Sequence, residues 1–141
     1  MRDLHNTIDY RNLFPPKAAI TDNTPFVSNI IDLQNSDAVE FVMVTGTDAD
    51  ADATFATTIA VGDDSALADG AAPPASDLIG TLAQASYTFA DDGKTRKLGY
   101  CGPKRYAQVT VTPSNNTGNA FLAGTAAVRM KQAPTANPPT A

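Results

Sequence analysis

Residues 54–61 read TFATTIAV, and Phe55, Thr57, Ile59 and Val61 fall on alternate positions of this stretch. Alternation with period two places successive side chains on opposite faces of a strand, so the stretch is predicted to be a half-buried β-strand. The same period recurs in VEFVM (39–43) and AQVTV (107–111), and further strands are expected at 26–33 and 120–130, with Gly124 as a candidate break in the last one. The repeated pattern predicts an all-β protein.

Length and composition narrow the fold further. The chain has 141 residues, a charged fraction of 18%, ten prolines, nine glycines and no Trp. A chain of this length forms one domain, whose core is expected to be thin because large apolar side chains are scarce. Frequent Pro and Gly divide the chain into short elements. We therefore predict a single jelly-roll-like β-sandwich domain over residues 18–130.

Both ends of the chain differ from this central domain. Residues 1–17 are polar and contain Pro15-Pro16, which forces the preceding residues toward extended backbone. Residues 131–141 (KQAPTANPPTA) contain three prolines and nothing large to bury. We expect an extended N-terminal arm and an extended or flexible C-terminal tail, both ordered on the surface of a neighbouring subunit.

The pair Asp92-Gly93 separates two alternating runs within residues 85–100. Asp-Gly favours a two-residue hairpin turn with positive φ, so a β-hairpin is predicted here. With Asp91 opposite Lys94, the register pairs Phe89 with Arg96, Tyr87 with Leu98, and Ala85 with Tyr100.

Charge is divided along the sequence. Thirteen of the fifteen acidic residues lie between residues 18 and 93, where there is no Lys or Arg, and residues 94–141 carry seven basic residues and no acidic one. Opposed fields on a subunit steer encounter and fix register. The division favours assembly with copies of the same chain or with a partner, through a basic surface built from the late strands.

Few residues are candidates for metal binding or catalysis. Asp48, Asp50 and Asp52 alternate like the start of a calcium loop, but the Gly and Glu that such a loop requires are missing, so they are weak metal candidates. His5 is the single histidine, and Cys101, the single cysteine, is expected to be a buried or half-buried structural residue. We expect no enzymatic activity and no cofactor.

Several classes of protein are disfavoured. The net charge of −5 argues against direct nucleic-acid binding. No apolar run is long enough for a membrane span, and the N-terminus lacks the apolar core of a signal peptide. We expect a protein made in a reducing cytoplasm without an internal disulfide.

Three stretches of the sequence are similar to segments of known proteins. They are YTFADD (87–92), KLGYCGPKRY (97–106) and TVTPSNNTGNA (110–120), and GTDADADATF (46–55) adds to them. Together they resemble a family of small virion proteins of tailed bacteriophages and prophages. The resemblance covers most of residues 25–130 and implies a β-sandwich that attaches to the phage particle.

The resemblance implies a structural function: a decoration (cement) protein on the outside of the capsid, which stabilises the head by bridging neighbouring capsid subunits. Its partners would be the major capsid protein and copies of itself, as a homo-oligomer on the virion. Two alternatives stay open, a stabiliser or ring at the head–tail junction or tail, and a carbohydrate-binding module for host adsorption. The candidate partner-binding residues are Lys97, Lys104, Arg105, Tyr106, Arg2 and Arg11.

Overall fold

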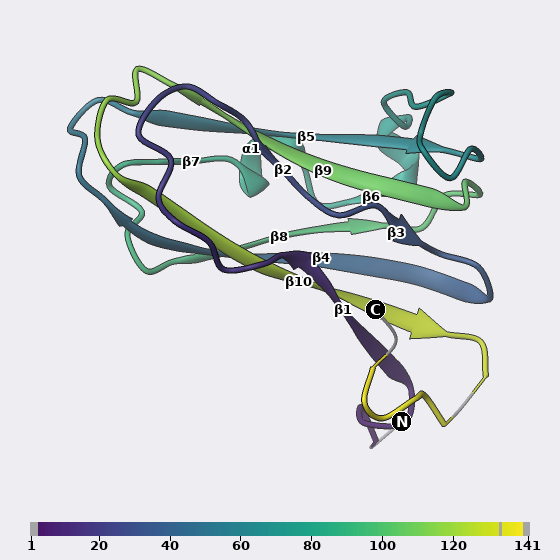
Figure 1. Ribbon diagram of the computed structural model, residues 1–141. Helices are drawn as coiled ribbons and strands as arrows, with labels where there is room; N and C mark the ends of the chain where they lie inside the picture. Colours follow the sequence, from purple (N-terminus) through teal and green to yellow (C-terminus); the bar gives the residue numbers. More distant parts are fainter. Residues whose placement is uncertain (1–2, 133, 140–141) are drawn as a thin grey trace.

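The computed structural model describes residues 3–132 and 134–139 and shows two antiparallel sheets packed face to face (Figure 1). Sheet A has the strand order β1-β10-β4-β8-β6, and sheet B has the order β2-β9-β5-β7, with β3 also paired to β9. The prediction of an all-β sandwich is confirmed. The elements are β1 (Ile8–Phe14), β2 (Phe26–Val27), β3 (Ile31–Asp32), β4 (Ser36–Asp48), β5 (Thr54–Gly62), a short 3-10 helix (Ala75–Asp77), β6 (Leu78–Ile79), α1 (Leu82–Ala85), β7 (Tyr87–Thr88), β8 (Thr95–Tyr100), β9 (Tyr106–Ser114) and β10 (Ala120–Met130).

The core forms where the inward positions of the two sheets meet. The period-two prediction holds for the three central strands, whose buried members are Val39, Phe41 and Met43 in β4, Phe55, Thr57, Ile59 and Val61 in β5, and Ala107, Val109 and Val111 in β9. Strand β10 is continuous through Gly124, which pairs with Met43. The predicted strand at 26–33 is instead two short strands, β2 and β3, on one edge of sheet B.

Strand β1 corrects the expectation of an N-terminal arm. Residues 8–14 pair along β10, and Leu13 and Phe14 are buried in the core. The alternation of apolar and polar residues does not reveal this strand, because Asp9 occupies an inward position. Asp9 is only 3% exposed and is ion-paired with Arg11. A charged pair replaces the apolar residues that period-two patterning relies on.

The two chain ends pack on one another. Thr135 donates its backbone N–H to the Asn6 carbonyl at 3.0 Å and its hydroxyl to the His5 carbonyl at 2.8 Å. We call residues 3–7 and 134–139 the terminal lobe, and Figure 1 shows it projecting beyond the sandwich. The described part of the tail therefore lies on the chain's own N-terminal segment, where we had expected contact with a neighbouring subunit.

The predicted hairpin at residues 85–100 is wrong. Strand β7 pairs with β5 in sheet B, whereas β8 pairs with β4 and β6 in sheet A. A turn does form at the expected place, with a hydrogen bond of 3.3 Å from the Lys94 N–H to the Asp91 carbonyl and a φ of +62° at Gly93, but Asp92 lacks the positive φ that was predicted at both central positions. Turn chemistry is local and does not specify which sheet each flanking strand joins, so residues 89–94 cross between the sheets.

Candidate functional site

The predicted partner-binding cations are engaged within the chain. Lys97 contacts Glu40 at 3.4 Å, and Lys104 contacts Asp63 at 2.5 Å. These pairs join acidic residues of the first two-thirds of the sequence to basic residues of the last third, because the late strands lie beside the early ones. The charge division of the sequence is therefore not a division in space, and Lys97, Lys104 and Arg105 are each paired with an acidic residue of their own chain.

Arg105 makes the most extensive of these contacts. Its Nε and Nη2 donate to the Asp32 carboxylate at 2.9 and 2.8 Å, and Nη2 also donates to Gln34 Oε1 at 2.8 Å. The guanidinium carbon lies 4.9 Å from the ring centroid of Tyr106, within cation–π range. The hydrogen bond from Arg105 lowers the pKa of Asp32. This geometry gives Arg105 and the half-buried Tyr106 a structural role between β3 and β9.

Arg11 is likewise held by its surroundings. Its Nε donates to Asp9 Oδ2 at 2.9 Å, and its Nη1 donates to the Asp32 carbonyl. Its side chain is only 13% exposed, so Arg11 is poorly placed to reach a partner. Arg2 lies outside the described residues.

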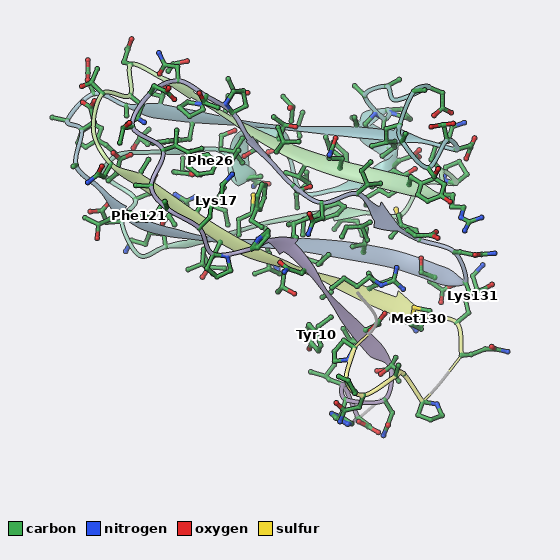
Figure 2. All side chains as sticks on the ribbon, viewed as in Figure 1. Tyr10, Lys17, Phe26, Phe121, Met130 and Lys131 are labelled. Carbon is green, nitrogen blue, oxygen red and sulfur yellow. The ribbon has the colours of Figure 1, made fainter. Side chains whose placement is uncertain are left out.

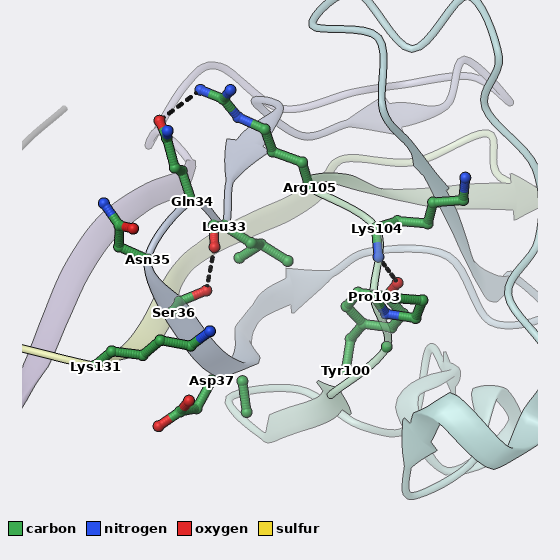
Figure 3. Close-up of a pocket in the computed structure, with 12 residues that line it drawn as sticks. Leu33, Gln34, Asn35, Ser36, Asp37, Tyr100, Pro103, Lys104, Arg105 and Lys131 are labelled. Atoms are coloured by element: carbon green, nitrogen blue, oxygen red, sulfur yellow. Dashed lines mark hydrogen bonds between the residues drawn. The ribbon is translucent and has the colours of Figure 1, made fainter.

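A cleft opens at the end of the sandwich where β4 begins (Figure 3). Its volume is about 370 Å³, and its wall is formed by residues 33–38, the loop at 102–105, Tyr100 and Lys131. Tyr100 is buried, and its hydroxyl accepts a hydrogen bond from the Lys104 N–H at 3.1 Å, which fixes the loop. The accessible groups are amides, a carboxylate and ammonium groups, so the cleft suits a polar ligand.

The alternating aspartates do not converge on a metal. Asp48 Oδ1 accepts from the Asp50 N–H at 3.1 Å, and Asp50 Oδ2 accepts from the N–H and the hydroxyl of Thr117 at 2.6 and 2.8 Å. The Thr117 hydrogen bonds lower the pKa of Asp50, whereas burial raises the pKa of Asp48. Across residues 3–132 and 134–139, no group of three His, Cys, Asp or Glu side chains is arranged to hold a metal ion. These aspartates instead order the loop between β4 and β5.

The outer face of sheet A is the feature that sequence reasoning missed. We call it face A, and among the outward positions of β1, β4 and β10 it presents a group of apolar and small side chains with one threonine, which are Tyr10, Val42, Val44, Phe121, Ala123, Thr125 and Ala127. The polar outward positions Asn12, Glu40 and Arg129 lie beside this group. Tyr10, Val44 and Phe121 are 46%, 47% and 44% exposed. The alternation in VEFVMV marks β4 as a strand, but both Val42 and Val44 are apolar at positions that solvent would normally make polar. That departure from alternation was the available signal.

Face A carries a groove of about 210 Å³ at the end remote from the termini. Phe121 lies over Gly46, where an added Cβ would meet the Phe121 Cβ at 2.6 Å. Val44, Ala123 and Pro16 continue the apolar lining, and Lys17 stands at the rim. The Lys17 ammonium lies 6.0 Å from the Phe26 ring centroid and makes no ion pair with any carboxylate of the described chain (Figure 2).

Cys101 is exposed, contrary to expectation, because it follows the last residue of β8 in a loop. Its Sγ lies 3.5 Å from the Asp77 carbonyl. Among the described residues, no helix is long and apolar enough to cross a membrane.

No protein-family model matches this chain, and no curated protein matches it. Among solved structures, the chain is similar to the CBM22-1 and GH10 modules of a Clostridium thermocellum endo-1,4-β-D-xylanase complexed with xylohexaose, with 12% identity and a TM-score of 0.44. That match covers 94% of this chain and 29% of the xylanase chain.

In two other solved structures, the match covers most of this chain and most of the matched chain. The CBM22-1 xylan-binding domain from Paenibacillus barcinonensis has 10% identity and a TM-score of 0.42, with 90% of this chain and 94% of that chain covered. The CBM32 of AlyQ in complex with 4,5-unsaturated mannuronic acid has 17% identity and a TM-score of 0.38, with 82% and 96% covered. Scores at this level do not assign a function to this chain.

Proposed function

We propose that this chain is a non-enzymatic structural protein of a tailed-phage particle. In this proposal it binds the outside of the capsid as a decoration protein and stabilises the head by bridging neighbouring subunits. The sequence resemblance of residues 46–55 and 87–120 to small virion proteins is one support. The observation that carries the proposal is face A, a broad sheet surface that exposes apolar and small side chains.

The composition of face A is suited to contact with another protein. Tyr10, Val44 and Phe121 are surrounded by small residues, so the sheet can be approached closely. Glu40 of the central strand β4 and Lys97 of the neighbouring strand β8 are paired at 3.4 Å, so their charges offset each other. Exposed apolar patches of this kind mark interaction surfaces, because their burial removes apolar area from water.

A particle-binding assay tests the proposal. Purified protein is mixed with expanded heads that lack it, prepared from the phage that carries the gene, and bound protein is measured by co-sedimentation. We expect Val44→Glu to abolish binding, because it places a charge in the middle of face A. Thr112→Glu is the matched control, since Thr112 is an exposed strand position on the outer face of sheet B.

Both variants must retain the wild-type circular dichroism spectrum and melting profile for the comparison to count. Val44→Glu that binds heads as well as wild type would contradict the proposal. Copy number in purified particles separates this proposal from a head–tail ring: a decoration protein scales with the number of capsid subunits, and a ring component with a single ring.

A second candidate function is carbohydrate binding, which the polar cleft favours. Gln34, Asn35 and Asp37 present amide and carboxylate groups, and Lys131 presents an ammonium group, on the walls of a cavity of about 370 Å³. Such groups can exchange hydrogen bonds with sugar hydroxyls. The structures named above are carbohydrate-binding modules, the class to which this candidate belongs.

A glycan array followed by titration calorimetry tests this candidate. Binding that is lost in Asn35→Ala and Asp37→Ala but kept in Thr112→Ala would support the cleft as a sugar site. A chain that binds no glycan on the array is not a carbohydrate-binding module of this kind.

A further inference from the structure

Among the residues that the structure describes, the most exposed large hydrophobic side chain lies in the terminal lobe. Leu4 is 65% exposed, and it follows Asp3, whose carboxylate accepts a hydrogen bond from the Asn6 N–H at 3.2 Å. Asp3 has no ion pair with any cation of the described chain. The lobe therefore offers an exposed apolar side chain that is next in sequence to a carboxylate.

The groove on face A offers the complementary chemistry. Its walls are apolar, formed by Pro16, Val44, Phe121 and Ala123, and its rim carries the Lys17 ammonium without a carboxylate partner. A cavity of about 210 Å³ is large enough to accept one aliphatic side chain. The lobe and the groove thus match in both apolar character and charge.

A single chain cannot make this contact with itself. Strand β1 runs between the two features, with Ile8 at the lobe and Phe14 toward the groove, and its seven residues span roughly 20 Å at about 3.3 Å per residue. Figure 2 shows Phe121 and Lys17 toward the end of the sandwich that is remote from the termini. The lobe of one copy can therefore reach only the groove of another copy.

We propose that copies of this chain associate head to tail, with Leu4 of one copy inserted in the groove of the next and Asp3 paired with Lys17. Burial of Leu4 against Phe121 supplies the attraction, and the ion pair sets the register. Such an interface is heterologous, so it repeats from copy to copy and produces a row of subunits or, where the rotation between copies closes, a ring. This deepens the proposed function, on which it rests, by naming the contact between neighbouring copies on a particle.

Sedimentation velocity of the full chain over a range of concentrations tests the proposal. We expect the wild type to form dimers and longer species, and Leu4→Ala, Asp3→Lys and Lys17→Asp each to weaken association at least tenfold. Ile79→Ala is the matched control for Leu4, since Ile79 is 60% exposed on β6. Asp37→Lys is the control for the charge reversal, because Asp37 is exposed and makes no ion pair in the described chain.

A mixing experiment gives the sharpest readout. Asp3→Lys and Lys17→Asp are each expected to associate at least tenfold more weakly alone, because each then carries like charges on its lobe and its groove. An equimolar mixture restores both complementary contacts, since the lobe of each variant then meets a groove of opposite charge on the other. The mixture should therefore form longer species in which the two variants alternate, and a chain with both reversals should form longer species by itself. Higher salt should weaken the charge-dependent part of every contact.

Three results would overturn the proposal: a wild type that stays monomeric up to about 1 mM, variants that associate like wild type, or a mixture that remains monomeric. Head binding is measured separately, as described above. Heads that bind the wild type while the solution contact is absent would leave the proposed function standing and remove this inference alone.

Discussion

The Thr45 side chain holds the loop through which the chain passes from sheet B to sheet A. Its side chain is 4% exposed, and its hydroxyl accepts from the Lys94 N–H at 2.9 Å and donates to the Asp91 carbonyl at 2.5 Å. A further backbone hydrogen bond of 2.9 Å runs from the Thr45 N–H to the Lys94 carbonyl. The Thr45 hydroxyl therefore anchors the crossing loop, residues 89–94, to β4.

Thr45→Val keeps the shape of the side chain and removes both hydroxyl hydrogen bonds. Each bond contributes ~1 kcal/mol net, and the loss is larger when a partner stays buried without a replacement. The added methyl group returns up to ~0.8 kcal/mol of apolar burial. We therefore expect the free energy of unfolding to fall by about 1–2 kcal/mol, which corresponds to a melting temperature lower by about 3–8 °C.

Thermal melts and hydrogen exchange check this expectation. Exchange should accelerate at residues 88–95 and stay unchanged in β9. Thr112→Val is the matched control, because Thr112 is exposed and its hydroxyl makes no hydrogen bond in the described chain, so its effect should stay within about 0.5 kcal/mol. If Thr45→Val and Thr112→Val melt at the same temperature, Thr45 does not anchor the loop.

Three further changes follow from the same structure. Burial raises the pKa of Asp48 in the folded chain, so the charged carboxylate opposes folding at pH values above that pKa. Asp48→Asn should therefore raise the melting temperature at pH 7. Thermal melts across the pH range should show this gain disappear near pH 3, where the carboxyl is protonated in both the folded and the unfolded chain. Deleting residues 1–17 removes β1 with the buried Leu13 and Phe14, so the truncated chain should lose at least about 3 kcal/mol of stability or fail to fold. A truncated chain that unfolds in urea like the wild type would refute the assignment of β1 to the core. Arg105→Glu should lower the urea midpoint of unfolding, since it places a second carboxylate beside Asp32. Asp32→Arg added to it should recover part of that loss, and no recovery would show that the two side chains act independently.

Local sequence patterns were enough to predict the class of fold and the inward-facing residues of the three central strands. Period-two runs at 39–43, 54–61 and 107–111 require a sheet with one buried face, because successive side chains of a strand point in opposite directions. Turn positions were also readable locally, as at Gly93, where a positive φ favours glycine. These features depend only on neighbours in the chain, so one sequence is enough to predict them.

The pairing of the strands, in contrast, depends on contacts between segments that are far apart in the sequence. The runs on either side of Asp92-Gly93 entered different sheets because Tyr87 stacks on Phe55 at 4.6 Å in sheet B, while β8 pairs with β4 in sheet A. The same long-range pairing brought Asp32 to Arg105 and Asp63 to Lys104, so charges that are separated in sequence order lie next to each other in the fold. It also assembled face A and its groove from β1, β4 and β10, which are far apart in sequence. Contacts between distant segments set these features, and no local pattern encodes them.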